Sequence, residues 1–509
     1  MERVHRHLEM TPPGTLIDII GRSACERPGA GVFVGPTHRT WAEFDARTQR
    51  AAQVLRRLGL RRGGRAGILG RNCPEWLEVF CAVHAAGGVV VPVNERLTPG
   101  ERRWLLADAG VTLLVGHADL LTETSFSGPT LAFGAGYENA LATAPEQHCG
   151  VSIQPDDLAV IAYTSGTTGT PKGVMWSHRG LLSSAQCNPF PPDVAGGARV
   201  LVCAPLYAGG AIVMACNALA IGALLVVVPF SPEAILQTLA DDHIEFTGLV
   251  PTMISLLVDA APPGWRAPRL RRIYYGGGTM SPQLFARAQR LFACEFEQAY
   301  AMTETCILGT RLDPADHRLD RPERLASAGK PMPGVGLRIV GPDGSEVPTG
   351  TPGEILIRSP GNMLGYWRHR EQDRLRPQNG WYGTRDIGRF DGDGYLYLVD
   401  RQDDMVKSGG LNVSPAEVED VLTAHPGVAE AAVIGSPDVR WGERVTAVVR
   451  TRTGVALPAD TLIAFCRSRL ADFKAPRIIV FTDVPLPRTG LGKVSRQAVR
   501  KRYASRRAE

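Results

Sequence analysis

Lysine is scarce in this chain of 509 residues. Six of its 56 Lys and Arg residues are lysine, at positions 172, 330, 407, 474, 493 and 501, and the other 50 are arginine. Lysine carries a compact ammonium on a flexible stem, whereas arginine carries a planar guanidinium. We therefore expect some of the remaining lysines to lie where a compact cation is needed, and we rank them first as candidate functional residues.

The chain also lacks a large excess of either charge. Its 56 basic and 51 acidic residues give a net charge of +5, which is small for this length and indicates no nucleic-acid partner. The ten cysteines include no Cys-x-x-Cys pair, which favours free thiols in a reducing compartment. The first residues form no apolar leader, so we expect a cytoplasmic protein.

One long apolar run stands out, at residues 211–230. Its twenty residues carry no charge, and on length alone it would qualify as a transmembrane helix. Asn217, Gly222 and Pro229 interrupt it. We therefore expect no membrane span, and predict a buried helix over 211–221 followed by a buried strand of a parallel sheet.

Helix and strand signals alternate through the first part of the chain. Thr40 and Glu43 form a capping box in front of an amphipathic helix that ends near Gly59. The next predicted elements are a strand at 66–69, a helix at 75–86 and a strand at 89–93. The same order recurs near 157–230 and 231–275, which predicts an α/β architecture with largely parallel sheets.

The pattern changes near residue 335 to short alternating strands, such as 353–358 and 395–399, which predicts a smaller β-rich unit. Beyond residue 400 it is mixed, with helices predicted at 415–424 and 459–470 and a strand at 428–434.

The segment 391–394 is similar to the start of a calcium-binding loop. However, Tyr395 and Gln402 stand where such a loop needs ligand side chains, the second of them a glutamate. We therefore predict a hairpin turn there.

The segment from Tyr163 to Val174 carries the clearest chemical signal. It follows a buried strand at 158–162, and it interleaves glycines with Ser and Thr hydroxyls around Lys172. Backbone N–H groups and hydroxyls in such a loop can converge on phosphate oxygens, with the lysine as a movable counter-charge. It is not a Walker A loop, because Pro171 and Gly173 stand where that motif needs Gly and Ser or Thr. The alternative is a flexible linker, which would not explain the lysine.

Together with four further motifs, this segment resembles the adenylate-forming (ANL) superfamily, which includes acyl-CoA synthetases, adenylation domains and beetle luciferases. The five motifs lie in the family's order, at 163–174, 298–304, 382–388, 400–419 and 487–493. The resemblance implies an α/β fold with a large N-terminal domain at 1–400, built from stacked, mostly parallel sheets plus a β-rich subdomain. It also implies a small, mobile α+β C-terminal domain at 401–509.

The resemblance implies a role for each motif residue. The phosphates of ATP would be held by Thr164, Ser165, Gly166, Thr167, Thr168, Gly169 and Lys172. The nucleotide and acyl group would be approached by the glycine turn Gly276, Gly277 and Gly278 and by Gln298, Ala299 and Tyr300, with Tyr300 against adenine. Thr303 would touch the α-phosphate, Glu304 would help to hold Mg²⁺, and Asp386 would accept hydrogen bonds from the ribose hydroxyls.

In the C-terminal part, Lys493 is the first-ranked catalytic residue, because its ammonium would offset the charges of the substrate carboxylate and the α-phosphate. Arg401 and Asp403 match the family's hinge region. The loop that would enter the site for thioester formation carries Lys407, Ser408, Gly409, Gly410 and Asn412. The resemblance thus implies two catalytic poses of this domain. For Lys474 we expect a structural or surface role, and Lys330 and Lys501 are unassigned.

The chain departs from the family where the acyl group would bind. Many members have a Pro-Leu-Phe-His motif, but here Ala208 follows Tyr207, which suggests a reshaped carboxylate site. Ala301 replaces a usual glycine. The predicted acyl-pocket residues are uncharged: Tyr207, Gly209, Val250, Pro251, Gly276, Met302 and Ile307. They include no Asp that could pair with a substrate amine, which argues against an amino-acid substrate.

The resulting hypothesis is an acid:CoA ligase that uses ATP, Mg²⁺ and coenzyme A. Its acid would be apolar: medium-chain, aryl or polycyclic. One alternative transfers the acyl group to the phosphopantetheine of a carrier protein, and another is an inactive binding protein with the same fold. A homodimer is compatible with the sequence.

Overall fold

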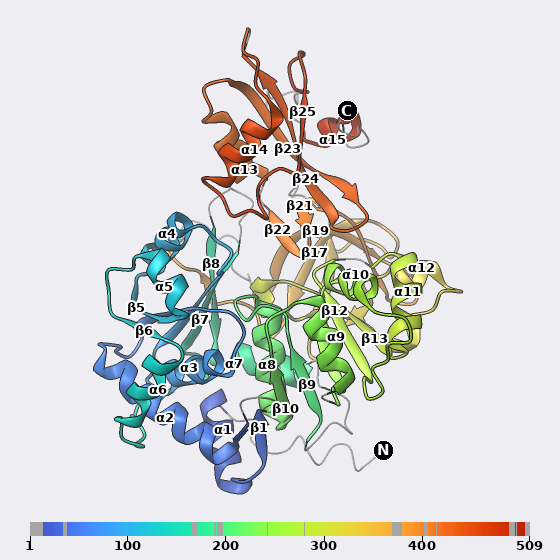
Figure 1. The fold of residues 1–509 in the computed structure, drawn as a ribbon. Helices are drawn as coiled ribbons and strands as arrows, with labels where there is room; N and C mark the ends of the chain where they lie inside the picture. Colours follow the sequence, from blue (N-terminus) through green and yellow to red (C-terminus); the bar gives the residue numbers. More distant parts are fainter. Residues whose placement is uncertain are drawn as a thin grey trace.

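The computed structural model describes residues 14–33, 38–164, 171–187, 190, 197–241, 243–278, 280–368, 379–401, 406–413, 415–452, 454–487, 494 and 496–503. Figure 1 shows two large α/β layers side by side, with the C-terminal part above them.

The first large sheet is built mainly from parallel strands. Its order is β18 (Gly365–Tyr366), β8 (Lys172–Ser177), β7 (Leu158–Thr164), β4 (Val89–Val93), β3 (Arg65–Leu69), β5 (Val111–Gly116) and β6 (Thr130–Ala132). Strands β7, β4, β3, β5 and β6 pair in parallel, while β8 pairs antiparallel with both of its neighbours. The helices of this part are α2 (Trp41–Arg57), α3 (Pro74–Ala85), α4 (Pro99–Ala109), α5 (Ala118–Thr124), α6 (Ala135–Ala142) and α7 (His178–Cys187).

The second large sheet has a parallel centre and antiparallel ends. Its order is β15 (Lys330–Pro331), β14 (Gly309–Leu312), β13 (Glu295–Ala301), β12 (Arg272–Gly276), β11 (Phe246–Leu249), β9 (Arg199–Val202), β10 (Leu224–Val227), β1 (Gly31–Phe33) and β2 (Arg39–Thr40). Its helices are α1 (Leu16–Glu26), α8 (Gly209–Ile221), α9 (Pro232–Asp241), α10 (Pro251–Ala260), α11 (Pro282–Phe292) and α12 (Pro322–Leu325). Helices α7 and α8 pack on each other within a hydrophobic core that draws on both sheets.

Several local predictions are confirmed. Thr40 caps α2 reciprocally with Glu43: its side chain accepts from the Glu43 N–H, and the Glu43 carboxylate accepts from the Thr40 N–H. The apolar run at 211–230 forms the buried helix α8 and then strand β10. Among the described residues, no helix is both long and apolar enough to cross a membrane. The ten cysteines are free thiols.

The predicted β-rich unit is a four-stranded antiparallel sheet in the order β16 (Gly336–Val340), β17 (Gly353–Arg358), β19 (Tyr382–Phe390) and β20 (Leu396–Arg401). The segment 391–394 is the tight connection between β19 and β20, as predicted. There the Asp391 carboxylate accepts hydrogen bonds from backbone N–H groups of its own turn rather than serving a calcium loop.

A separate C-terminal domain has its own sheet and core. Its elements are β21 (Val406–Ser408), β22 (Leu411–Val413), α13 (Pro415–Thr423), β23 (Val428–Asp438), β24 (Gly442–Thr451), α14 (Ala459–Arg467), β25 (Ile478–Phe481) and α15 (Arg496–Tyr503). Successive residues of β23 face opposite sides of the sheet, as strand geometry requires. Val433 packs with residues of α13 and α14, whereas Ala432 and Ile434 pack with residues of α15.

Lys474 joins this domain to the first large sheet. Its Nζ lies 3.0 Å from Glu101 Oε1 of α4 and 2.8 Å from Glu417 Oε1 of α13, and Lys474 is only 3% exposed. Burial disfavours its charge, but Glu417 and Glu101 outweigh burial and raise the pKa of Lys474. A buried ammonium between two carboxylates therefore holds the C-terminal domain against α4, which is the structural role expected for this lysine.

Candidate active site

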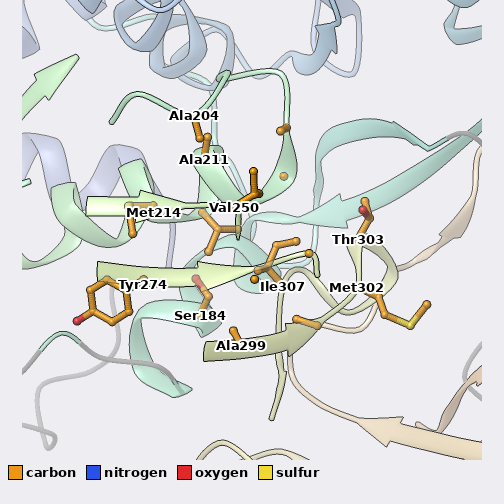
Figure 2. Close-up of a pocket in the computed structure, with 18 of the residues that line it drawn as sticks. Ser184, Ala204, Ala211, Met214, Val250, Tyr274, Ala299, Met302, Thr303 and Ile307 are labelled. Carbon is orange, nitrogen blue, oxygen red and sulfur yellow. The ribbon is translucent and has the colours of Figure 1, made fainter. Parts of the chain in front are cut away.

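A cavity of about 430 Å³ opens where the carboxyl ends of β11, β12 and β13 face the other sheet and the C-terminal domain. Ligand sites of open α/β sheets lie at these strand ends. Figure 2 shows the strands and helix that line the pocket, with Thr303 and Met302 at one end and Tyr274 at the other.

One end of the cavity is polar. Its lining includes Thr164 at the end of β7, Lys172 at the start of β8, Thr303 and Glu304 after β13, and Asp386 in β19. These residues come from three of the five sequence motifs, and the structure brings them to one wall. Lys172 is buried, at 6% exposed, beside the phenol ring of Tyr366 with its Nζ 5.5 Å from the ring centroid. A buried cation next to hydroxyls suits a bound phosphate.

Glu304 presents a carboxylate to this polar end. The Tyr366 hydroxyl donates to Glu304 Oε1 at 3.0 Å. Burial and the Glu304 charge raise the pKa of Tyr366, so the phenol stays protonated and remains a donor. Among the described residues, no group of three or more His, Cys, Asp or Glu side chains could hold a metal by itself. A single carboxylate beside a phosphate site fits Mg²⁺, which binds through one or two carboxylates and substrate phosphates.

Tyr300 is not part of the cavity lining, but its side chain contacts Asp386, which is. The Tyr300 hydroxyl donates to Asp386 Oδ2 at 2.7 Å, and Asp386 is 4% exposed. Thr384 holds the backbone there, because its hydroxyl accepts from the Asp386 N–H and donates to the Ile355 carbonyl. The predicted adenine and ribose residues are therefore adjacent, and their side chains are already hydrogen-bonded to each other.

The glycine turn after β12 needs its glycines for two different reasons. A Cβ on Gly276 would lie 2.8 Å from the Ala299 carbonyl oxygen of the neighbouring strand. Gly277 has a φ of +74°, which side chains rarely tolerate. Both line the cavity, as does Ala299, whereas Gln298 and Gly278 are not part of its lining.

Five of the seven predicted acyl-pocket residues line the cavity: Gly209, Val250, Gly276, Met302 and Ile307. Tyr207 and Pro251 are not part of the lining. The Tyr207 side chain lies near the charges of Arg96 and Glu95. Among the residues that the structure describes, its buried hydroxyl has no hydrogen-bond partner. Ala208, at the position where many family members carry His, does line the cavity.

The C-terminal domain contributes a turn to the same cavity. Gly409 and Gly410, between β21 and β22, have φ angles of +61° and +76°, and Gly410 is part of the lining. A Cβ on Gly410 would lie 2.7 Å from Val250 Cγ2, and a Cβ on Gly409 would lie 2.9 Å from the Trp441 ring. Glycine is therefore required twice for the turn to reach the cavity. Lys407 and Ser408 are half-buried in β21 behind it.

Some predicted residues lie outside the described part of the chain. These are Ser165, Gly166, Thr167, Thr168, Gly169, Asp403 and Lys493, together with the side chains of Arg401 and Asn412. The Arg401 backbone is described and pairs with Asp386 across β19 and β20.

Two groups of lining residues were missed by the sequence reasoning. Tyr366 and Tyr382 flank Glu304 at the polar end. Ser184, Asn217, Tyr274 and Glu297 line the opposite end. Asn217 carries a signal in the sequence, because it is the one strongly polar residue in the apolar run at 211–230. An isolated amide in such a run marks a candidate cavity residue as well as an interruption of a membrane helix. The others carry no signal of spacing or composition.

Comparison with known proteins agrees with the motifs. The family model of the AMP-binding enzyme matches residues 21–367, and that of the AMP-binding enzyme C-terminal domain matches residues 417–493. The chain is 38% identical to feruloyl-CoA synthase from an Amycolatopsis species, over 92% of this chain and 95% of the relative. It is 33% identical to the fatty acid–[acyl-carrier-protein] ligase ScoC from Streptomyces coeruleorubidus, over 91% of each chain.

The fold is similar to that of o-succinylbenzoate CoA synthetase (MenE) from Bacillus subtilis, at 29% identity. For a double mutant bound with its product analogue OSB-NCoA, the TM-score is 0.85, covering 95% of this chain and 98% of that one. For the same protein in complex with its acyl-adenylate intermediate, the TM-score is 0.69, covering 96% and 99%. With the family model matched over most of its length, this chain belongs to the AMP-binding enzyme family of the adenylate-forming superfamily.

Proposed function

We propose that this enzyme is an acid:CoA ligase. It would convert a carboxylate and ATP into acyl-AMP and pyrophosphate, and then transfer the acyl group from AMP to the thiol of coenzyme A. One observation carries the proposal: a single cavity joins a phosphate-binding end, an apolar channel and a turn of the C-terminal domain. All three substrates can therefore meet in one place.

In the first step a substrate carboxylate oxygen attacks the α-phosphorus, and the bond to pyrophosphate breaks. Two anions must approach each other, so their charges have to be offset. Lys172 and Thr164 lie where they would bind the leaving phosphates, Thr303 would contact the α-phosphate, and Asp386 would hold the ribose. Glu304 would hold Mg²⁺, which supplies charge neutralisation when bound. Lys493 would bring the second cation.

In the second step the CoA sulfur attacks the acyl carbonyl, AMP leaves, and the thiol proton is released. The Gly409-Gly410 turn forms the cavity wall beside Val250, at the glycine turn where acyl group and nucleotide would join. Because neither residue has a side chain, a narrow thiol-bearing arm can pass close to the backbone there.

The two steps would use two positions of the C-terminal domain. We infer a division at 1–400 and 401–509, with the hinge at Asp403 just after β20. The greater similarity to the product-analogue complex of MenE than to its acyl-adenylate complex supports the view that this structure has the thioester-forming arrangement. The Lys474 contact with Glu101 and Glu417 would belong to this arrangement. Rotation toward the adenylating arrangement would break the ion pair between Lys474 and Glu101 and bring Lys493 into the active site.

The acid is inferred from the channel walls, which are apolar. The lining includes Val213 and Met214 of α8 together with Gly248, Val250, Gly276 and Ile307. These walls support a medium-chain, aryl or polycyclic acid rather than an amino acid. The relatives whose names identify an aromatic acid support the same class.

The direct test mixes the enzyme with a panel of such acids, ATP, Mg²⁺ and either CoA or a phosphopantetheinylated carrier protein. We expect pyrophosphate release with the preferred acids and acyl-CoA in equal amount, measured separately. Formation of the acylated carrier protein without acyl-CoA would contradict the acid:CoA ligase assignment and support the carrier-loading alternative. The ScoC relative is named as a ligase of that kind. Neither product across the panel would favour a binding protein.

Exchange of Gly410 for alanine should separate the two steps. An alanine at a φ of +76° is strained, and its Cβ would press on Val250. We expect thioester formation from supplied acyl-AMP to fall about tenfold or more, while pyrophosphate release stays within about twofold. Lys493→Ala is the matched opposite, because it should abolish pyrophosphate release and spare thioester formation. Equal loss of both half-reactions in both variants would contradict the proposal that the C-terminal domain takes a different position for each step.

Exchange of Lys474 for methionine should affect the same step through domain docking. It leaves the carboxylates of Glu101 and Glu417 near each other with no cation between them. We expect thioester formation to slow about tenfold and adenylation to be unchanged, as measured by the two half-reactions. The control is Lys501→Met, an exposed lysine of α15. If Lys474→Met behaves like this control in both steps, the contact has no role in docking.

A further inference from the structure

The end of the cavity opposite Thr303 carries polar side chains that the proposed reaction does not use. Ser184 of α7, Asn217 of α8 and Tyr274 of β12 all line the cavity. Figure 2 shows Tyr274 at the far side of the pocket from Thr303 and Met302. We call these three residues the distal polar subsite. An acyl chain bound with its carboxylate near Thr303 would point its other end toward them.

Strand register sets the depth of this subsite. Gly248, Tyr274 and Glu297 are paired side by side in β11, β12 and β13. Tyr274 and Glu297 lie two residues before the pair Gly276 and Ala299 along their strands, and so farther from the carboxyl ends where the cavity opens. Because Gly276 and Ala299 have little or no side chain and Tyr274 and Glu297 have large ones, the side-chain volume of the sheet wall increases with depth.

Helix α8 runs over this wall in the opposite direction. Gly209 lies near the mouth, against Trp176, whose indole donates to the Thr303 carbonyl at 2.7 Å. Met214 lies against Gly248, and Asn217 follows almost one turn deeper. The eight steps from Gly209 to Asn217 span about 12 Å of helix. This length accommodates an aromatic ring together with a short carbon chain.

Asn217 is held in one orientation. The Ser184 hydroxyl donates to Asn217 Oδ1 at 2.6 Å, and the two residues are 1% and 7% exposed. With its oxygen engaged, the amide offers its nitrogen as a donor. Within the described part of the chain, this nitrogen has no hydrogen-bond partner, and Asn217 lines the cavity.

Tyr274 carries a second unsatisfied group. Its hydroxyl oxygen is buried and has no hydrogen-bond partner in the described structure. Phe190 and Phe246 pack around its ring, with centroids 5.5 and 6.4 Å away. The nearby Arg272 directs three nitrogens at Glu295 and Glu297.

Buried polar groups without partners are unfavourable, and an entirely apolar acyl tail would leave both of them so. We propose that the distal polar subsite binds a neutral hydrogen-bonding substituent, such as a phenolic hydroxyl, at the far end of an aromatic carboxylic acid. A hydroxyl can accept from the Asn217 amide and pair with the Tyr274 phenol. This inference rests on the proposed ligase function, and it names the acid more narrowly.

The same end of the cavity disfavours a second carboxylate. Glu297 also lines it, is 3% exposed, and places a carboxylate beside Tyr274. The two arginines near Glu297 also bind other carboxylates: Arg272 donates to Glu295 as well as to Glu297, and Arg311 donates to Asp313. The flat wall of Gly248, Gly276, Ala299 and Ala301 favours a ring over a branched chain, because these positions have no side chain beyond Cβ.

The experiment compares cinnamic acid, its 4-hydroxy and 4-carboxy derivatives, and octanoic acid, by pyrophosphate release and acyl-CoA formation. We expect kcat/KM for the 4-hydroxy acid to exceed that for cinnamic acid about tenfold, with the 4-carboxy acid poorest. Tyr274→Phe and Asn217→Leu should each reduce this preference severalfold, and the melting temperature and circular dichroism spectrum of each variant without ligand serve as the folding control.

The matched control is Tyr275→Phe. Tyr275 is the next residue of β12, and its hydroxyl is already paired with His317 Nε2 at 3.0 Å, so this variant should keep the wild-type preference. The proposed subsite would be refuted if the wild-type enzyme had nearly equal kcat/KM for the 4-hydroxy acid and for cinnamic acid. It would also be refuted if both Tyr274→Phe and Asn217→Leu left the ratio of these two kcat/KM values unchanged.

A binding measurement separates this inference from the ligase assignment. The shift in melting temperature caused by each acid in the presence of AMP should be larger for the 4-hydroxy acid in the wild type than in Asn217→Leu. If this difference is found without any acyl-CoA, the subsite stands and the ligase function fails. If acyl-CoA forms equally from all four acids and no binding difference is found, the function stands and the subsite fails.

Discussion

The close approach of Gly410 to Val250 is the contact on which the complete site depends. Every other described residue of the cavity lining comes before the end of β20, whereas this turn belongs to a domain with its own sheet and core. The turn reaches the wall only because two successive glycines adopt positive φ angles and leave no Cβ in the way. Lys474, buried between Glu101 and Glu417, holds the same docking from another side. The finished site is therefore a property of domain docking.

A gradient of polarity runs along the cavity and follows from sheet geometry. Parallel strands end at one edge, so loops after different strands collect their polar residues there. Deeper in, each strand alternates between faces, so only every second residue reaches the cavity. In β13 these are Ala301, Ala299 and then Glu297. The wall thus changes from polar to apolar and back to polar, which suits an acid whose two ends differ from its middle.

The scarcity of lysine was a useful but incomplete guide. Lys172 lies in the cavity wall, and Lys407 lies in the strand that leads to the Gly409-Gly410 turn. Lys474, for which the sequence predicts only a structural or surface role, is the most deeply buried cation described at the domain contact. Its partner Glu101 is 373 residues away in the sequence, and no local pattern could connect them. The ammonium fits because it can face two carboxylates from different directions.

The α/β class, the capped helix α2, the buried helix and strand at 211–230 and the motif residues that line the polar end could all be predicted from the order of the residues. Each depends on short-range periodicity or on a contiguous motif, which the chain order preserves. The position of Tyr207 outside the cavity and the hydrogen bond from Tyr366 to Glu304 follow from packing in three dimensions. The same packing brings Ser184, Asn217 and Tyr274 together from two helices and a strand. Contacts of this kind depend on how sheets and helices cross in space, and linear spacing carries no record of that.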